Sequence, residues 1–449
     1  MSKPHLLYIA FAFPPSTASS VYRCTAVANA FAEDGWDVTV LTLDRNIWSE
    51  ISGVDQKLAD SVDPRIRVVQ VDDGGSEEPA RGDLRRFSRL RIEAPYLWKE
   101  VARRRGRKDF PEDFHGAWLA PASAAARSIH AEKPVDLVMA SAGPYVSFGV
   151  ARCLEGVPYI MDYRDAWAFN TFSEASKYTP DSKQGRFEAE YLCNAAQVWF
   201  VNGPIRDEYA RRYPDAADKM RVVENGFDPQ PGHGQPPPRQ TTTPTFGYLG
   251  TLLYERMPTQ EFLDGWRQAS TGEGSSGKLH AVFRGKMSSS GAASAEVLRA
   301  FADVEAFGLR HLGPISKRDV AKFYNRLDAL VLLLPSGKYV TGGKTAEYLA
   351  TGLPIVSVHD LGIAATYQLK DYPLWFPAKD LTPESIAAAL QACADALAHP
   401  DSAAWQAAWE YGQQFARSAI LAPVISDLRR LVGHPLQQPV AEVQRSPKP

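Results

Sequence analysis

The sequence predicts an α/β fold with two doubly wound parallel sheets. Short apolar runs alternate with longer helical stretches, and several of these runs are apolar throughout. Strands that helices cover on both faces have this composition. The alternation stops at residues 229–245, a stretch of Pro, Gly, Gln and Thr, and then starts again. Two successive βαβα halves therefore predict two such sheets, and the 449 residues are enough for two cores with a cleft at the strand ends.

In the first half we expect seven strands, at residues 6–11, 37–42, 66–71, 136–141, 158–162, 197–202 and 220–225. Helices are expected between them, for example at 21–34 and 120–132. Gly35 follows the first of these helices, where glycine commonly ends a helix. In the second half we expect strands at 245–250, 279–285, 308–313, 327–334 and 353–358.

These elements predict five parts of the chain. Residues 1–228 form a first domain, 229–244 a semi-stiff proline-rich linker, and 245–403 a second domain. Residues 404–434 are expected to form closing helices that are interrupted near Pro423. The tail, 435–449, contains four prolines and little to bury, so we expect it to be disordered.

Composition excludes several classes of protein. The chain has 50 Lys and Arg against 52 Asp and Glu, so its overall charge gives no reason to expect a nucleic-acid partner. Its four cysteines are widely spaced and predict reduced, mostly buried thiols, and no Cys/His cluster predicts a metal site. The short apolar run at the N-terminus predicts a buried strand and not a signal peptide. With no apolar stretch of transmembrane length, we expect a cytoplasmic protein.

The segment GKYVTGGKTAEYLATGLP, residues 337–354, contains the clearest binding motif. Five residues separate Gly337 from Gly343, one more than a Walker A loop has, which argues against a P-loop NTPase. A glycine turn between a buried strand and a helix favours an anion, and Lys344 adds a full positive charge. Glu347 lies on the same helix face as Lys344 and could accept hydrogen bonds from a ribose. The segment therefore fits a nucleoside diphosphate, or else a glycine turn with a surface ion pair.

The same segment resembles the donor site of family-4-type glycosyltransferases of the GT-B fold, whose G-K-x-x-E-Y-x-A-x-G-x-P pattern it matches in order. Residues 246–258 and 312–336 resemble the segments that precede this site. In the first half, residues 12–23 resemble the family's first loop, and GVPYIMDYRDAW at 156–167 resembles another of its segments. The resemblance implies two Rossmann-like domains and transfer of a sugar from a nucleoside diphosphate donor to an acceptor hydroxyl. It also implies retention of configuration, no bound metal and no other cofactor.

The resemblance assigns roles to particular residues. The catalytic pair is Arg164 and Asp165, which otherwise would be a buried pair that holds the strand–loop corner. An Arg cannot act as a base, so Arg164 would stabilise the leaving phosphate, and Asp165 would orient it or accept the proton of the acceptor. The donor residues are Gly250, Thr251, Gly342, Gly343, Lys344 and Thr345 around the diphosphate, Glu347 at the ribose, and Pro314 and Ile315 at the base. The acceptor residues are Ser19, Ser20 and Arg23.

The chain departs from the family pattern at three points. Ala18, Ser19 and Ser20 stand where many relatives have two glycines. Val340 stands where retaining relatives carry the first of two glutamates, and Thr251 where an Arg is common, so that Arg256 and Arg284 are candidates to replace that Arg. These departures leave two alternatives open. One is a nucleotide-sugar epimerase of the same architecture, and the other is a non-catalytic relative that binds sugar nucleotides.

Residues 81–108 form a basic segment with eleven Lys and Arg against three Asp and Glu, interleaved with aromatic and aliphatic residues. Such a segment can dock on an anionic lipid surface or hold an acidic acceptor. It can also be a solvated insertion. The first interpretation predicts an enzyme on the inner face of a membrane, whose acceptor is a glycan, a lipid-linked intermediate or a small molecule.

Overall fold

The computed structural model describes residues 3–434 except 45–47, 49–52, 73–87, 95, 99, 102–103, 105–109, 112–114, 230–233, 236, 253–255, 272–277, 288–294 and 317–318. Contacts divide the chain into two compact units. The first contains residues 1–162, 194–198 and 421–449, and the second contains residues 163–193 and 199–420. The predicted tail, 435–449, lies outside the described residues.

The seven strands expected in the first half form one sheet. They are β1 (His5–Ala10), β2 (Asp37–Leu43), β3 (Arg67–Val71), β4 (Leu137–Ser141), β5 (Tyr159–Tyr163), β6 (Gln197–Phe200) and β7 (Met220–Val222). Their order is β3-β2-β1-β4-β5-β6-β7, so the strand order reverses between β1 and β4. Within the part of this order that runs β3-β2-β1-β4-β5, every pair of neighbouring strands is parallel. Burial of β1, β4 and β5 along their whole length agrees with their largely apolar sequences.

Helices and short 3-10 turns separate these strands. They are α1 (Val21–Glu33), α3 (Gln56–Ala59), α4 (Arg89–Glu93), η3 (Gly116–Trp118), α6 (Leu119–Glu132), α7 (Val146–Ala151), α8 (Lys183–Asn194), α9 (Gly203–Arg212) and η4 (Pro214–Lys219). The helices expected at 21–34 and 120–132 are confirmed as α1 and α6. Gly35 has φ +87° just after α1, which is the backbone conformation that favours glycine at a helix end.

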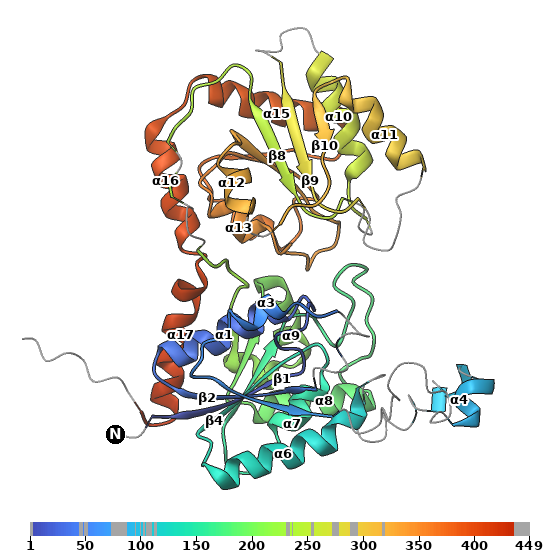
Figure 1. Cartoon of the computed structure of the whole chain (residues 1–449), viewed down its shortest axis with the longest axis vertical. Coiled ribbons are helices and arrows are strands. Elements are labelled where there is room, and N and C mark those ends of the chain that lie inside the picture. The colour runs from blue at the N-terminus through green and yellow to red at the C-terminus, as the bar shows by residue number, and fades with distance from the viewer. Residues whose placement is uncertain are drawn as a thin grey trace, which may run out of the picture. The chain divides into compact units, whose positions relative to one another are not determined.

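The second sheet has six strands. They are β8 (Thr245–Leu249), β9 (His280–Arg284), β10 (Leu309–His311), β11 (Ala329–Leu333), β12 (Ile355–Val358) and β13 (Trp375–Pro377), in the order β10-β9-β8-β11-β12-β13. All adjacent pairs are parallel, and β8, β9 and β10 are visible side by side in Figure 1. The first five strands were expected. The sixth was not, because three residues that end in a proline carry no strand pattern.

The helices that accompany the second sheet are α10 (Thr259–Thr271), α11 (Ala295–Glu305), α12 (Val320–Tyr324), α13 (Thr345–Leu349), α14 (Thr366–Leu369) and α15 (Pro383–Ala398). Gly265 allows α10 to approach α15 closely, because an added Cβ would lie 2.6 Å from Ile386 Cβ. The described linker residues form neither helix nor strand, and Thr241 N donates to Leu397 O at the end of α15.

Two helices follow, α16 (Ser402–Gln413) and α17 (Arg417–Leu431). The predicted interruption near Pro423 is wrong, because Pro423 lies inside α17 and the helical stretch breaks at residues 414–416. At this break the backbone pairs with Phe227, which donates to Phe415 O and accepts from Arg417 N. Packing of Leu421, Ile425 and Leu428 into the core holds α17 together around the proline.

Candidate functional site

A pocket of about 350 Å³ lies in the second compact unit. Loops that leave the carboxyl ends of β5, β6, β8 and β11 line it. In doubly wound parallel sheets, ligands bind at this end of the strands. The volume falls within the range of small-molecule sites, roughly 300–1,000 Å³. The pocket is therefore the candidate functional site.

Seven of the predicted site residues line this pocket: Arg164, Asp165, Gly250, Thr251, Gly342, Gly343 and Lys344. They come from three loops that lie far apart in the sequence. The structure thus brings the predicted catalytic pair and the predicted diphosphate turn to one cavity. The other nine predicted residues are not among the described residues that line it.

Lys344 and Glu347 contact each other as their i,i+3 spacing predicts. Lys344 Nζ donates to Glu347 Oε2 at 2.7 Å, and the hydroxyl of Tyr324 donates to Oε1, also at 2.7 Å. Tyr324, on α12, is buried, and burial together with the adjacent carboxylate holds the pKa of its hydroxyl well above the usual value. The hydroxyl stays protonated, so the Glu347 carboxylate is oriented from both sides.

The turn before α13 depends on glycine at position 342. Gly342 has φ +65°, and an added Cβ would lie 2.4 Å from Leu334 Cδ2. An added Cβ at Gly343 would meet nothing within 4 Å, so the turn is open on that side. Because α13 has only five residues, we expect its dipole to contribute little. Lys344 is thus the main source of positive charge at this turn. Thr345 is buried, and its hydroxyl donates to Thr341 O at 2.7 Å.

Arg164 and Asp165 follow β5 directly. Arg164 Nη2 lies 3.8 Å from Asp165 Oδ2, and the two side chains are 18% and 64% exposed. This long contact and the exposure of Asp165 contradict the alternative that the two form a buried pair at the strand–loop corner. A different pair holds this corner: Arg23 Nη2 donates to Asp162 Oδ1 at 2.7 Å, with both side chains buried.

Of the three predicted acceptor residues, only Ser19 is exposed. Ser20 precedes α1 and is 5% exposed, and Arg23 is 4% exposed. Arg23 Nε also donates to Asp162 Oδ2 at 3.0 Å, and the hydroxyl of Ser141 donates to the same oxygen at 3.1 Å. In this structure Arg23 therefore links α1 to the end of β5.

The four remaining donor residues lie in the second unit, with Arg284 at the end of β9 and the other three on loops. Arg256 has φ +63° and Nη1 donates to Phe172 O at 2.6 Å, while Arg284 Nη1 donates to Leu312 O at 2.7 Å. The backbone of Arg284 also accepts from Gly250 N at 3.0 Å, which ties β9 to the loop after β8. Pro314 is exposed after β10, and Ile315 packs partly buried against the core of the second sheet.

The sequence interpretation missed two side chains that shape the pocket. Asn202 Nδ2 donates to Tyr339 O at 3.0 Å and to Thr341 Oγ1 at 2.7 Å, while its Oδ1 caps α9. It stands just after β6, and the rule that strand ends carry site residues could have identified it. Tyr348 is fully buried, and its hydroxyl accepts from Leu249 N at 2.8 Å. Its position in the sequence motif gave no indication of this contact.

Among the described residues, no group of three or more His, Cys, Asp or Glu side chains is placed to hold a metal ion. Within the same residues, no helix combines the length and the apolar character needed to cross a bilayer.

Residues 20–226 match the model of the glycosyl transferase 4-like domain family. No curated protein sequence matches the chain significantly. Among solved structures, a glycosyltransferase from Rickettsia africae is similar over 96% of this chain and 100% of its own, with a TM-score of 0.64 and 12% identity. Sucrose-phosphate synthase from Thermosynechococcus elongatus is similar over 96% of this chain and 99% of its own, with a TM-score of 0.59 and 16% identity. Anabaena HepE, in complex with UDP and glucose, is similar over 95% of this chain and 100% of its own, with a TM-score of 0.56 and 13% identity. These similarities confirm the expected GT-B fold of two parallel-sheet domains.

Proposed function

We propose that the protein transfers a sugar from a nucleoside diphosphate donor to an acceptor hydroxyl, and the match of residues 20–226 to the model of the glycosyl transferase 4-like domain supports this proposal. One observation carries the proposal: Lys344 and its glycine turn line the same pocket as Arg164 and Asp165. A cationic glycine turn suits a diphosphate, and an Arg can pair with the phosphate that leaves the sugar. The complex of Anabaena HepE with UDP and glucose supports a donor of this kind.

The diphosphate binds at Gly342, Gly343, Lys344 and Thr345 in this proposal. Lys344 Nζ already donates to Glu347, but an ammonium group has three donors and can serve a phosphate oxygen as well. Oε1 of Glu347 accepts from Tyr324 and Oε2 accepts from Lys344, and both oxygens keep lone-pair capacity for the hydroxyls of a ribose. The base would lie near Pro314 and Ile315. Arg256 and Arg284 would add positive charge beside the diphosphate.

The transfer step follows from charge balance. The bond between the anomeric carbon and the diphosphate oxygen breaks, and its electron pair leaves with the diphosphate. The acceptor oxygen forms the new bond on the same face of the sugar, so configuration is retained, and its proton passes to Asp165 or to the departing phosphate. Arg164 stabilises the charge that grows on this phosphate, a contribution on the order of 10²–10³ in kcat for one well-placed donor. No metal ion takes part in this scheme.

The acceptor enters over the first domain, residues 1–228, where Ser19 is exposed. We assign Arg23 an indirect part in this region, because its guanidinium is bound to Asp162, two residues before Arg164. The acceptor can be a glycan, a lipid-linked intermediate or a small molecule.

The protein also docks on an anionic membrane surface in our proposal. Most of the basic segment, 81–108, lies outside the described residues, but its described part exposes Tyr96 by 80%, Leu97 by 56% and Ile92 by 50%. Exposed apolar side chains within a cationic segment suit the boundary between lipid headgroups and acyl chains. Flotation with phosphatidylglycerol vesicles tests this, and a protein that stays at the bottom of the gradient at low salt contradicts it.

A turnover assay tests the proposed reaction. The protein is incubated with UDP-glucose, GDP-mannose and dTDP-glucose, with and without polysaccharide and lipid-linked acceptors, and both the free nucleoside diphosphate and the sugar are followed. A transferase releases the diphosphate, and acceptor accelerates the release. An epimerase, the second candidate, would change the sugar without acceptor. A relative that only binds sugar nucleotides would leave all three donors intact, and either of these two results contradicts the proposal.

A further inference from the structure

A buried carboxylate that the proposed reaction does not use lies close to the loop that carries Arg164 and Asp165. Glu188, on α8, is fully buried. Four tyrosine hydroxyls donate to it at 2.8 to 3.1 Å: those of Tyr163, Tyr178, Tyr209 and Tyr213. Burial raises the pKa of this carboxyl, while the four hydroxyls act in the opposite direction. A carboxyl group is costly to bury, so this arrangement needs a reason beyond packing.

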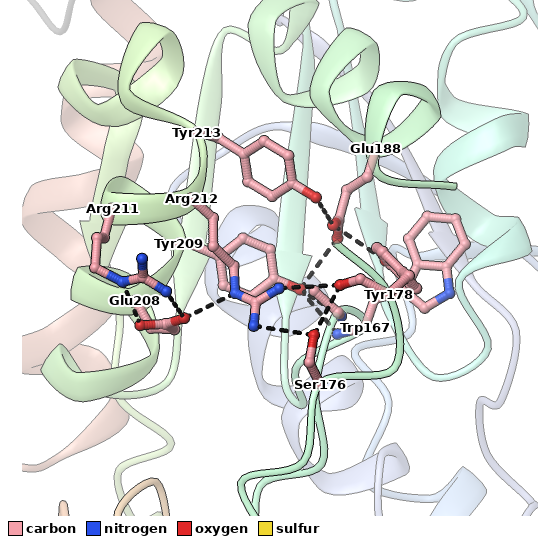
Figure 2. Close-up of polar contacts among 10 residues, drawn as sticks. Trp167, Ser176, Tyr178, Glu188, Glu208, Tyr209, Arg211, Arg212 and Tyr213 are labelled. Carbon is pink, nitrogen blue, oxygen red and sulfur yellow. Dashed lines mark hydrogen bonds and ion pairs between the residues drawn. The ribbon is translucent and has the colours of Figure 1, made fainter. Parts of the chain in front are cut away.

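Tyr209 connects this carboxylate to the loop after β5 (Figure 2). Its hydroxyl donates to Glu188 Oε1 at 3.0 Å and accepts from the backbone N–H groups of Trp167 at 2.9 Å and Ala168 at 3.2 Å. The two backbone N–H groups can only donate, so the hydroxyl hydrogen points to Glu188. The lone pairs of Tyr209 then face the loop. Glu188 thus orients the one hydroxyl that holds two consecutive backbone amides.

Further contacts fix the same stretch of the loop. The Trp167 ring meets Tyr178 edge-on at 6.2 Å, and Ala168 O accepts from Lys177 N at 2.8 Å. The guanidinium carbon of Arg212 lies 5.3 Å from the centre of the Phe169 ring, and Arg212 Nε donates to Glu208 Oε1 at 2.8 Å. These contacts hold residues 167–169. Arg164 and Asp165 precede that stretch by only two to three residues.

We propose that Glu188 and Tyr209 are positioning residues for the transfer step. Through the hydroxyl of Tyr209 they fix the backbone at Trp167 and Ala168, and with it the direction in which Arg164 and Asp165 enter the pocket. The inference rests on the proposed function. Neither residue lines the pocket among the described residues, so both act through the loop and not on the donor.

Two tyrosine variants test this proposal: both remove a hydroxyl that donates to Glu188, but only one of these hydroxyls also contacts the loop. Tyr209→Phe removes the hydroxyl that bridges Glu188 and the loop. Tyr213→Phe is the matched control, because its hydroxyl donates to the other carboxylate oxygen, Oε2, at 2.8 Å, whereas the N–H groups of Trp167 and Ala168 donate to Tyr209. The first readout is amide hydrogen exchange. We expect faster exchange at Trp167 and Ala168 in Tyr209→Phe and wild-type exchange there in Tyr213→Phe.

The second readout is turnover of whichever of UDP-glucose, GDP-mannose and dTDP-glucose the wild type uses fastest. Tyr209→Phe is expected to lower kcat on the order of tenfold or more with little change in the KM for the donor, because misplaced catalytic groups cost rate more than binding. Glu188→Gln, which keeps the volume of the side chain, is expected to lower kcat in the same way. Tyr213→Phe should keep the wild-type kcat.

Two results separate the inference from the function beneath it. The positioning role of Glu188 and Tyr209 would be overturned if Tyr209→Phe and Tyr213→Phe exchanged equally fast at Trp167 and Ala168. It would also be overturned if the two variants had the same kcat. A wild type that turns over none of the three donors would overturn the proposed function, and the exchange measurement would still test the link between Tyr209 and the loop.

Discussion

His359 illustrates how the surroundings of one residue set its chemistry. It stands at the end of β12, is 1% exposed, and its Nε2 lies 3.2 Å from Thr366 Oγ1. Burial disfavours the charged ring and lowers its pKa from 6.5 to about 4, although Asp360 partly opposes this. The unfolded chain therefore binds a proton at a higher pH than the folded chain. The buried neutral ring therefore makes its full contribution to the free energy of unfolding above pH 6.5, and this contribution is lost as the pH falls from 6.5 towards about 4.

Replacing His359 should flatten this pH dependence. The shift corresponds to about 3 kcal/mol of unfolding free energy at about 1.4 kcal/mol per pKa unit. Urea unfolding at pH 7, 5.5 and 4.5 measures it. We expect His359→Asn to lose less stability over this interval than the wild type, whatever its stability at pH 7. His399→Asn removes an exposed histidine and serves as the control. Equal pH slopes in His359→Asn and the wild type would show that the buried ring does not titrate as described.

At the same scale, the sequence predicts contacts between near neighbours far better than contacts between distant residues. The i,i+3 spacing predicted the contact of Lys344 with Glu347, and the structure has it at 2.7 Å. Tyr324, the second partner of Glu347, is 23 residues away and could not be predicted from spacing. The partner of Arg23 could not be predicted either, because Arg23 lies on α1 and Asp162 lies on β5, 139 residues further along the chain. The roles of these residues in binding stay predictions.

At the scale of elements, α13 matters more as an anchor than as a dipole. It is only five residues long, yet Tyr348 from this helix reaches the end of β8 and accepts from Leu249 N. Gly250, which lines the pocket, is the next residue. The helix that follows the diphosphate turn therefore also fixes the loop on the neighbouring strand.

Tyr348→Phe should weaken both the fold and the pocket. It leaves the buried N–H of Leu249 without this partner, which costs about 1–3 kcal/mol of unfolding free energy. Tyr372→Phe is the matched control: its hydroxyl is also buried and donates to Leu353 O at 2.8 Å, away from the pocket residues. We expect chemical denaturation to show similar losses for both variants, and calorimetry to show weaker nucleotide binding for Tyr348→Phe alone. Unchanged nucleotide affinity in Tyr348→Phe would contradict the anchoring role.

Elements with a strong local pattern were predictable. Twelve expected strands appear, because each is a continuous apolar run or alternates clearly. β13 escaped prediction because three residues carry no period, and the break between α16 and α17 was misplaced because tertiary pairing with Phe227 decides it, not the proline. Local propensity is a weak guide wherever distant packing competes with it.

At the scale of the whole molecule, the restart of the strand pattern after residue 245 predicted a second parallel sheet, and both strand orders have the reversal expected of doubly wound folds. The sequence also predicted that site residues follow strand ends, and seven of them line one pocket. The sequence interpretation missed Asn202, although its place just after β6 could have identified it, and it could not predict Tyr348, whose contact with Leu249 depends on how separate loops meet.

Calorimetric titration with UDP, GDP and dTDP tests the central claim most directly, namely that a nucleoside diphosphate binds in this pocket at Lys344, with its ribose on the neighbouring Glu347. The wild type is compared with Lys344→Ala and Glu347→Ala, and with Lys370→Ala as a control for the loss of a lysine outside the pocket lining. We expect one nucleotide to bind at micromolar Kd and each pocket variant to lose about 1–3 kcal/mol of binding free energy through a missing charged partner, with Lys370→Ala unchanged. If no nucleotide binds, or if the pocket variants bind as the wild type does, the donor site and the proposed transfer are both wrong.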